Sequence, residues 1–543
     1  MTREQERQEL YKTIWQIAND LRGSVDGWDF KAYVLGMLAY RYLSESLAGE
    51  LNRGEREAGE VNFDYARQDE CLEGQDRLNF VQNRGYYIEP GLLFENVMQR
   101  GEDELNIYLD KALRQIEASG EGTGAAKMFE GLFTDVDLNS NKLGATTEER
   151  NRRLKKLMQS IGSLKLGTYM TDRVGSIGRV GGAESGVDIF GDAYEYLMTM
   201  YAANAGKSGG EYFTPPEVSD LLARIVTENG AKKPPRGEWR CYDPTCGSGG
   251  LLLKFLRILN YMDAITLHGQ EKNVTTYNLC RVNMLLHGMN WSKLYIRNGD
   301  TLTNPDPDLD ERKPFDAIVS NPPYSLKWVG EDDINLVQDA RFQGPGRLAP
   351  KGKADLAFVM HSLRYLADDG IAAIVCFPGV LYRTGAEAKI REWLVEQGHV
   401  DAVIGLPGKL FFGTGITTAI LVLKKGLSDG RTLFVDASKY FVPSTNSNKL
   451  SDENIQDVMK ILLDRKDVDH VAKLADKSMI REQEYNLSVS MYVEKEDTSE
   501  KIDIDALEAD IETTVSRESS LRRDIDNIVA MLRQGWNNGG VMA

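Results

Sequence analysis

Four consecutive residues beyond the middle of the chain combine an amide side chain, a rigid backbone and an aromatic ring. They are Asn321, Pro322, Pro323 and Tyr324, and they follow an apolar segment, residues 315–320, that is typical of a β-strand. Two successive prolines fix the backbone and remove two N–H donors, which leaves carbonyl oxygens and the Asn321 carboxamide to accept hydrogen bonds. A plain turn at a strand end is the alternative, but the residues on either side of the prolines favour a chemical role.

The turn suits chemistry at the exocyclic amino group of a nucleobase. Such a group has two N–H bonds to donate, while its nitrogen lone pair is delocalised into the ring. If the Asn321 side-chain oxygen accepts one proton and the Pro322 carbonyl the other, the nitrogen becomes more tetrahedral and its lone pair is freed. Tyr324 offers a flat face on which an extruded base stacks. The turn therefore predicts a site that makes an amino nitrogen a nucleophile.

A glycine-rich stretch, DPTCGSGG at residues 243–250, follows an earlier strand pattern and opens a helix. Its spacing differs from the G-x-G-x-x-G of dinucleotide sites, the obvious rival. Acidic residues stand at the ends of three successive strand patterns around this loop, which favours a nucleoside cofactor without phosphates. S-adenosylmethionine fits, because its sulfonium is cationic. The expected contacts from this part of the chain are Asp243, Ser248, Gly249, Gly250, Glu271 and Asp300.

A third stretch, GGEYFTPPE at residues 209–217, precedes the glycine loop. We expect Thr214 to cap the following helix, with Pro215 at the first helical position and Glu217 completing a capping box. Tyr212 and Phe213 are then placed to form a wall for the methionine end of the cofactor.

The elements that must position these residues alternate between strands and helices, the pattern of a doubly wound α/β domain. Residues 1–165 are expected to form a helical N-terminal domain, and residues 166–450 an α/β domain with a seven-stranded, mostly parallel sheet. We expect strands at residues 240–243, 264–269, 294–298, 317–320, 371–377, 400–406 and 417–423, and helices between them at 251–259, 354–366 and 386–396.

Residues 451–543 are predicted to form a helical C-terminal region that binds a partner. Seven apolar residues there follow an a/d heptad seam, which Thr514 and Glu518 interrupt. A surface helix on its own domain gives a similar pattern, so both readings stay open. The seam residues are Ile504, Leu507, Ile511, Leu521, Ile525, Ile528 and Leu532.

The composition limits the class of protein. None of the five cysteines forms a CxxC pair, which indicates a reduced, cytoplasmic setting and no structural metal. No apolar run is long enough to span a membrane. The net charge of −17 is unusual for a protein that grips DNA alone, because affinity for DNA comes largely from neutralising phosphates. We therefore expect a partner that supplies much of that grip.

Taken together, the motif order EYFTP, DP..GSG, NPPY resembles the modification (M) subunit of type I restriction–modification systems. The likeness extends to WQIANDLRG at residues 15–23 and GRLAPKGKAD at residues 346–355. The resemblance implies a Rossmann-like, S-adenosylmethionine-dependent adenine-N6 DNA methyltransferase, with Asn321 to Tyr324 as the catalytic turn. Gly250, where many members carry a bulky apolar residue, is a departure. The residues implied to bind cofactor are Glu211, Tyr212, Phe213, Thr214, Pro215, Pro216, Ser248, Gly249, Gly250 and Glu271.

The resemblance also implies partners: double-stranded DNA, a specificity (S) subunit that reads the sequence, a restriction (R) subunit and a second M subunit. Two other functions remain as rivals. One is a methyltransferase with the same turn that acts on cytosine, ribosomal RNA or a glutamine amide. The other is a non-catalytic scaffold for the S subunit. Residues 325–349, polar and without clear periodicity, are expected to form either a disordered surface loop or a lid over DNA.

Overall fold

The computed structural model describes residues 29–69, 71–164, 214–228, 237–259, 264–411, 415–427, 429–444, 447–496 and 503–538, besides Lys12. The chain divides into two compact units, one that ends at Glu494 and one that begins at Lys495. Within these ranges, no helix has both the length and the apolar character needed to cross a membrane.

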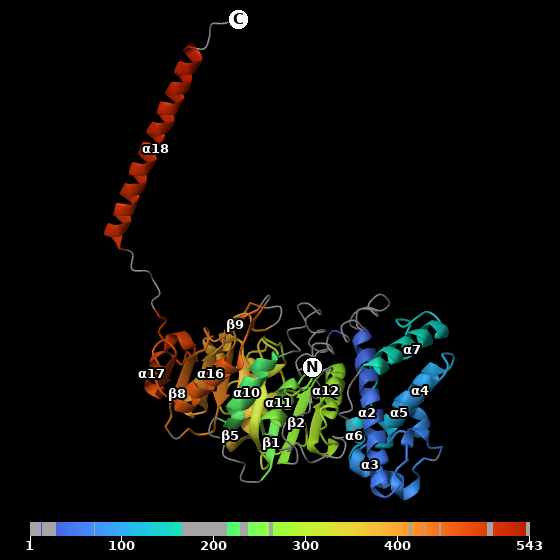
Figure 1. The fold of residues 1–543 in the computed structure, drawn as a ribbon. Coiled ribbons are helices and arrows are strands. Elements are labelled where there is room, and N and C mark those ends of the chain that lie inside the picture. Colours follow the sequence, from blue (N-terminus) through green and yellow to red (C-terminus); the bar gives the residue numbers. More distant parts are fainter. Residues whose placement is uncertain are drawn as a thin grey trace. The chain divides into compact units, whose positions relative to one another are not determined.

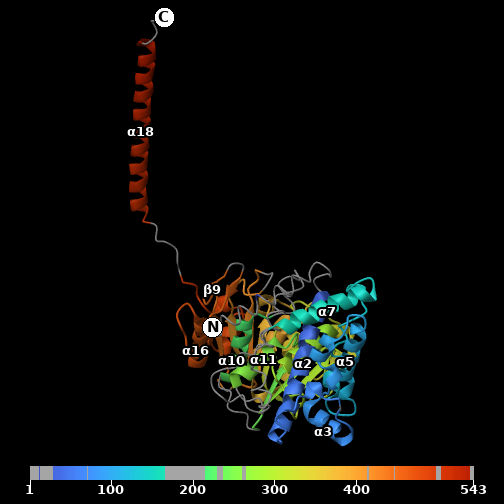
Figure 2. The ribbon, with the colours of Figure 1, turned by 45° about the vertical axis from the view of Figure 1, so that its right-hand side comes forward.

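The first unit begins with a bundle of helices (Figures 1 and 2). Each long helix buries one apolar stripe; in α5, for example, Leu105, Leu109 and Ile116 are buried at helical spacing. Two 3-10 turns, η1 (Tyr65–Arg67) and η2 (Pro90–Leu92), connect the bundle. Its helices are α2 (Asp29–Glu57), α3 (Gly74–Arg84), α4 (Phe94–Gln99), α5 (Leu105–Ser119), α6 (Ala126–Phe129) and α7 (Thr147–Ser163).

A nine-stranded sheet of order β11-β8-β6-β7-β5-β4-β1-β2-β3 follows. It is mostly parallel, with antiparallel pairs only where β7 meets β5 and β6 and where β11 meets β8. The strands are β1 (Trp239–Asp243), β2 (Ile265–Glu271), β3 (Leu294–Asn298), β4 (Phe315–Ser320), β5 (Leu366–Cys376), β6 (Val400–Gly405), β7 (Ala419–Leu423), β8 (Thr432–Asp436) and β11 (Ala472–Ala475). A separate hairpin pairs β9 (Val442–Pro443) with β10 (Asn448–Lys449).

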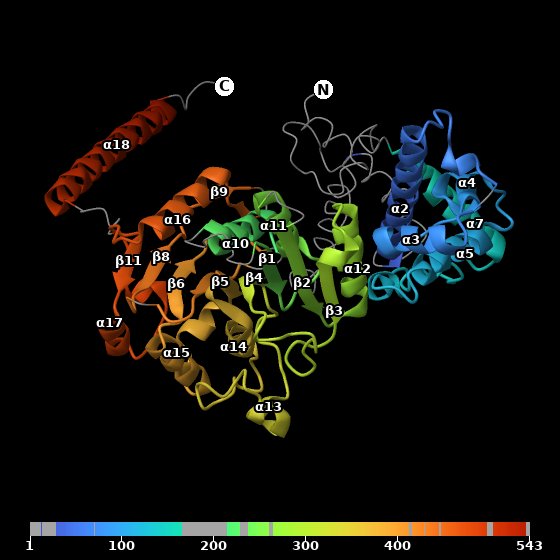
Figure 3. The same ribbon diagram turned by 90° about the horizontal axis from the view of Figure 1, so that it is seen from below.

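Helices cover both faces of this sheet (Figure 3). On one side are α10 (Pro216–Glu228), α11 (Gly250–Leu259), α12 (Val274–Leu286) and α16 (Asp452–Asp464); on the other are α14 (Asp355–Tyr365), α15 (Ala386–Glu396) and α17 (Lys477–Glu482). Side chains along a strand alternate between faces, so Ala317 and Val319 of β4 enter one core and Ile318 the other. Phe315 shares the core of Ile318 because the strand is irregular between Phe315 and Ala317. Burial on both faces explains why the central strands are almost wholly apolar.

All seven expected strands are present, but the prediction missed β8 and β11. The sheet therefore runs past residue 450, where the sequence analysis ended the α/β domain. Strand β11 pairs antiparallel with β8 through Ala472 to Ala475, and the compact unit extends to Glu494. The physical reason is that a four-residue edge strand of sequence AKLA has too few residues to show an alternating pattern.

The helical bundle is fastened to the sheet domain through α12. Arg281 on that helix is 1% exposed, and its Nη1 donates to the main-chain oxygens of Lys127, Met128 and Glu130 at 3.2, 3.0 and 2.9 Å. The side chain of Asp135 accepts from Thr275 and Asn278 at the start of the same helix. Because α12 follows β2 directly, this contact also holds α12 in place beside the carboxyl end of β2, where Glu271 lies.

The described residues of the second unit, which begins at Lys495, include one long helix, α18 (Ile504–Asn538). Every seam side chain is at least half exposed within the chain: Ile504, Leu507, Ile511, Leu521, Ile525, Ile528 and Leu532. Rows of exposed apolar side chains are typical of interaction surfaces, and partner binding by this helix stays a prediction.

Replacing Arg281 with methionine is expected to lower the free energy of unfolding by about 1–3 kcal/mol, because three buried carbonyl oxygens lose their donor. Urea unfolding followed by circular dichroism measures the change. The control is Arg312→Met, whose side chain is 89% exposed, with an expected effect within about 0.5 kcal/mol. Equal stability of the two variants would show that Arg281 does not anchor the bundle.

Candidate functional site

The Asn-Pro-Pro-Tyr turn leaves the carboxyl end of β4, which lies between β5 and β1 in the sheet. The loop that follows β1 lies beside it, because the hydroxyls of Thr245 and Ser320 are 2.7 Å apart. Ligands of open α/β sheets bind at this edge. The structure therefore brings together the catalytic turn and the glycine loop, which the sequence predicted independently.

The Asn321 carboxamide is hydrogen-bonded at both of its ends. Its Nδ2 donates to Thr214 Oγ1 at 3.0 Å, and its Oδ1 accepts a proton from the Tyr324 hydroxyl at 2.9 Å. Burial raises the pKa of Tyr324 well above its ordinary value, so the phenol stays protonated and remains a donor at neutral pH. Thr214, a predicted cofactor residue, thus contacts the catalytic asparagine.

The expected capping box at Thr214 differs from the structure. Helix α10 begins one residue later than predicted, at Pro216, and the Ser219 amide donates to the Pro215 carbonyl. This register places the Thr214 hydroxyl beside Asn321. Of the same motif, Glu211, Tyr212 and Phe213 lie outside the described residues.

The glycine loop sits tightly on β2 and α12. The Cys246 amide donates to the Gln270 carbonyl at 3.0 Å, and Asn283 Nδ2 donates to the Ser248 carbonyl at 2.9 Å. Gly249 has a φ of +84°, and a Cβ there would overlap the side chain of Met284. Glycine is required at this position by both the backbone conformation and the space. Gly250 is the first residue of α11 and has open space around it.

Three acidic side chains line the adjoining strand ends, as predicted. Glu271 Oε2 accepts from the Gly247 amide at 3.2 Å, which ties β2 to the glycine loop. Asp300 Oδ1 accepts from the Leu302 amide, and its Oδ2 pairs with Lys272 Nζ at 2.9 Å. Burial raises the pKa of Glu271 above its usual range. The three side chains place carboxyl oxygens at this edge, which suits a ligand with cationic or hydroxyl groups.

Asp243 is the most unusual of the three, because it is fully buried. Its Oδ1 accepts from the Thr245 amide at 2.9 Å, whereas Oδ2 has no hydrogen-bond partner in the described part of the chain. Burial raises the pKa of this carboxyl group to about 7. A buried carboxylate oxygen without a donor fits a ligand that brings a positive charge or an N–H group.

A buried network that the sequence did not indicate supports the Asp300 loop. Arg341 donates to the main-chain oxygens of Thr301 and Leu302 at 2.8 and 2.9 Å, and to His361 Nδ1 at 2.9 Å. His361 Nε2 lies 2.9 Å from the Tyr242 hydroxyl of β1. Burial lowers the pKa of His361 well below its usual range, so the ring stays neutral and Nδ1 is free to accept. The network therefore holds the loop that carries Asp300 in place at the end of β3.

Arg341 belongs to the segment 325–349, for which the expectation of a disordered surface loop is wrong. The segment contains η6 (Gly330–Asp332) and α13 (Ile334–Gln338), and it buries Leu336 and Phe342. The Ser325 amide donates to the Asp355 carboxylate at 3.1 Å. Closure of this segment over DNA stays a prediction.

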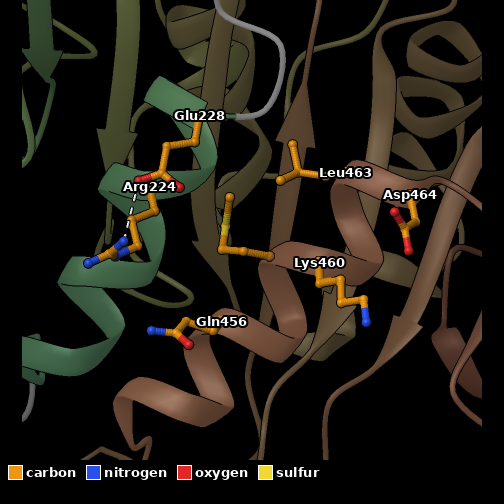
Figure 4. Close-up of a pocket in the computed structure, with 7 residues that line it drawn as sticks. Arg224, Glu228, Gln456, Lys460, Leu463 and Asp464 are labelled. Atoms are coloured by element: carbon orange, nitrogen blue, oxygen red, sulfur yellow. Dashed lines mark hydrogen bonds and ion pairs between the residues drawn. The ribbon is translucent and has the colours of Figure 1, made fainter.

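A surface hollow of about 230 Å³ lies between α10 and α16 (Figure 4). Arg224 and Glu228 from α10 face Gln456, Lys460, Leu463 and Asp464 there. Arg224 is ten residues beyond Thr214, about 15 Å along a helix. The hollow is therefore a separate feature and has no part in the catalytic turn.

Comparison with known proteins agrees with this geometry. Residues 185–501 match the family described as N-6 DNA Methylase, and residues 10–161 match the HsdM N-terminal domain. The type I restriction enzyme MpnII methylase subunit of Mycoplasma pneumoniae is 41% identical over 99% of this chain and 98% of its own. The MjaVIII methylase subunit of Methanocaldococcus jannaschii is 34% identical over 59% of this chain and 56% of its own length.

A solved structure is similar over nearly the whole molecule. The type I restriction–modification system methyltransferase subunit from Streptococcus thermophilus superposes with a TM-score of 0.78 and 35% identity. The match covers 90% of this chain and 100% of that one. The expected α/β methyltransferase fold, with its helical N-terminal domain, is thereby confirmed.

The affinity for S-adenosylmethionine is expected to rise about tenfold between pH 6 and pH 8. A cationic ligand favours the ionised form of Asp243, and the pKa near 7 in the free protein means that binding below pH 7 must first displace a proton. Above pH 8 the affinity should level off. Isothermal titration calorimetry at several pH values measures it.

The control for this pH dependence is Asp243→Asn, which removes the titrating group and is expected to bind more weakly with a flat profile. A wild-type affinity that does not change between pH 6 and pH 8 would contradict the role of Asp243.

Proposed function

The chain belongs to the N-6 DNA methylase family, and from that premise we propose that it is the methylating (M) subunit of a type I restriction–modification complex. It transfers a methyl group to the N6 nitrogen of an adenine that has been flipped out of double-stranded DNA. The observation that carries the proposal is the position of Asn321, whose carboxamide ends the central strand β4 beside a glycine loop and an acidic strand edge.

The chain's contribution to the reaction is to activate and hold the adenine. Asn321 Oδ1 and the Pro322 carbonyl each accept one N–H of the amino group, which moves electron density back to the nitrogen. Tyr324 stacks on the extruded base and keeps its plane fixed. Positioning and polarisation of this kind lower the barrier because the acceptors are preorganised. The Asn321 carboxamide is uncharged and is not a base, so it polarises the amino group without removing a proton from it.

The cofactor site follows from the acidic edge. S-adenosylmethionine, when bound, supplies an electrophilic methyl group. Asp243, Glu271 and Asp300 hold its cationic and hydroxyl groups, and Ser248, Gly249 and Gly250 let the backbone come close. Glu211, Tyr212, Phe213, Thr214, Pro215 and Pro216 complete the site from the EYFTP motif. Asp243 Oδ2, which has no hydrogen-bond partner within the ranges that the structure describes, supports this assignment.

The partners proposed are an S subunit, an R subunit, a second M subunit and DNA. Relatives named as methylase subunits of restriction enzymes support the first two. The net charge of −17 supports a division in which another subunit supplies most of the phosphate contacts. Sequence choice then belongs to the S subunit, and this chain supplies the chemistry.

We further propose that α18 docks on helices of the S subunit. Its apolar seam is exposed along the whole helix, and the heptad spacing is the one that pairs with another helix. Apolar side chains in such a row bury themselves only against a partner.

Replacing Asn321 with alanine is expected to lower the rate of methyl transfer at least about a hundredfold, the usual cost of removing one preorganised polar group at a reacting centre. Binding of S-adenosylmethionine should remain. Transfer of a labelled methyl group to DNA, RNA and protein, each offered separately, measures both rate and substrate class. Near-normal transfer by Asn321→Ala, or label that enters RNA or protein instead, would overturn the proposal.

Deleting residues 500–543 is expected to release the S subunit during co-purification, because the seam of α18 is lost. A finer variant, Ile511→Asp with Ile525→Asp, places two charges on the seam and should weaken the complex. Its matched control, Ser516→Asp with Ser519→Asp, adds the same charge to the outer faces of the helix. If both double variants keep the S subunit equally well, α18 is not the docking element.

A further inference from the structure

We propose that the Asn321 carboxamide is set from both ends before the substrate arrives: the Thr214 hydroxyl orients it, and the Tyr324 hydroxyl occupies the acceptor position that the adenine amino group later takes. Thr214 is then a positioning residue for the reaction, in addition to any contact with the cofactor. Because the incoming group is an adenine amino group, this assignment rests on the proposed function.

Orientation matters for an asparagine at this place, because the two ends of a carboxamide have nearly the same size and opposite hydrogen-bonding character. A carboxamide turned by 180° would present N–H donors to the N–H donors of adenine, and activation would fail. In the structure Thr214 Oγ1 accepts from Asn321 Nδ2 at 3.0 Å, and Oδ1 lies on the other side, where it meets the Tyr324 hydroxyl.

The source of this orienting contact is a different part of the chain. Thr214 lies two residues before the start of α10, which packs against β4 and β5, while Asn321 follows β4. The packing of that helix therefore sets the distance between the two side chains.

The other end of the carboxamide is closed by its own turn. The Tyr324 hydroxyl donates to Asn321 Oδ1 at 2.9 Å, in the same sense as an adenine N–H would. Burial raises the pKa of the phenol, which keeps its proton in place. We expect the adenine amino group to take the place of this hydroxyl, and the same movement frees the tyrosine ring to stack on the base. One side chain thus keeps the acceptor satisfied at rest and receives the base during the reaction.

The first test uses Thr214→Val, which keeps the shape of the side chain and removes the hydroxyl. The expected result is a fall of about tenfold in kcat, the size of one lost hydrogen bond, with restoration by Thr214→Ser. Thr227→Val is the matched control: it removes a buried hydroxyl that donates to the Ala223 carbonyl at the far end of the same helix. That variant should keep the wild-type kcat.

The kinetic constants separate orientation from cofactor binding. If Thr214 serves only the cofactor, Thr214→Val raises the KM for S-adenosylmethionine and leaves kcat unchanged, which would overturn its positioning role. The measurements use the full chain co-purified with its S subunit, on DNA whose methylated adenines have first been located by single-molecule sequencing.

The second test compares Tyr324→Phe with Tyr324→Ala. Phenylalanine keeps the stacking ring but cannot occupy the acceptor, so we expect the KM for DNA to fall about threefold or more. Alanine loses the stack, and KM should rise. If Tyr324→Phe loses activity as severely as Tyr324→Ala, the hydroxyl acts in the reaction itself and the resting role is wrong.

Measuring Asn321→Ala beside these variants distinguishes a failure of the proposed function from a failure of the positioning role of Thr214. An active Asn321→Ala enzyme refutes the proposed function and the positioning role together. An inactive Asn321→Ala enzyme with a wild-type kcat for Thr214→Val refutes only the role of Thr214.

Discussion

The hydrogen bond from Asn321 Nδ2 to Thr214 Oγ1 joins the two halves of the site. On one side of it lies a turn that two prolines make rigid; on the other lies the start of α10 and, before that, the motif assigned to the cofactor. Because hydrogen bonds hold both ends of the Asn321 carboxamide, its Oδ1 is an uncharged acceptor with a fixed direction. The sheet holds both residues of this hydrogen bond in place. Strand β4 positions Asn321, and helix α10, which packs on β4 and β5, positions Thr214.

The acidic side chains at the strand ends are also held in place by hydrogen bonds. Each carboxylate is tied to the backbone of a neighbouring loop, so that Glu271 shapes the glycine loop and Asp300 shapes its own turn. Arg341 and His361 support that turn from the opposite core, and Arg281 fastens the helical bundle to the helix that follows β2. Of these three acids, only Asp243 has a carboxylate oxygen without a hydrogen-bond partner among the described residues. A site that is preorganised in this way binds a cation at small further cost in ordering.

The sequence predicted those parts of the molecule whose signal is local. Seven strands followed from short apolar runs, and the helix at Ala386–Glu396 was placed at its observed ends. The positions of the Asn-Pro-Pro-Tyr turn and of the three acids at strand ends were predicted from residue type and strand pattern, and their roles stay predictions. Strand β11 was missed because the sequence AKLA is stabilised by its neighbour β8 and not by its own pattern. The contact between Thr214 and Asn321 joins positions 107 residues apart, and Arg341 binds main-chain carbonyls, which every residue has. Neither has a local sequence pattern.

The most direct test of the account is a structure of the chain with its S subunit, DNA that contains the target adenine, and a cofactor analogue that cannot donate its methyl group. The account predicts the adenine N6 within about 3 Å of both Asn321 Oδ1 and the Pro322 carbonyl oxygen. It also predicts the Tyr324 ring stacked on the base with its hydroxyl withdrawn from Asn321. A flipped adenine whose amino group lies away from Asn321, with the Tyr324 hydroxyl still bound to Oδ1, would contradict it.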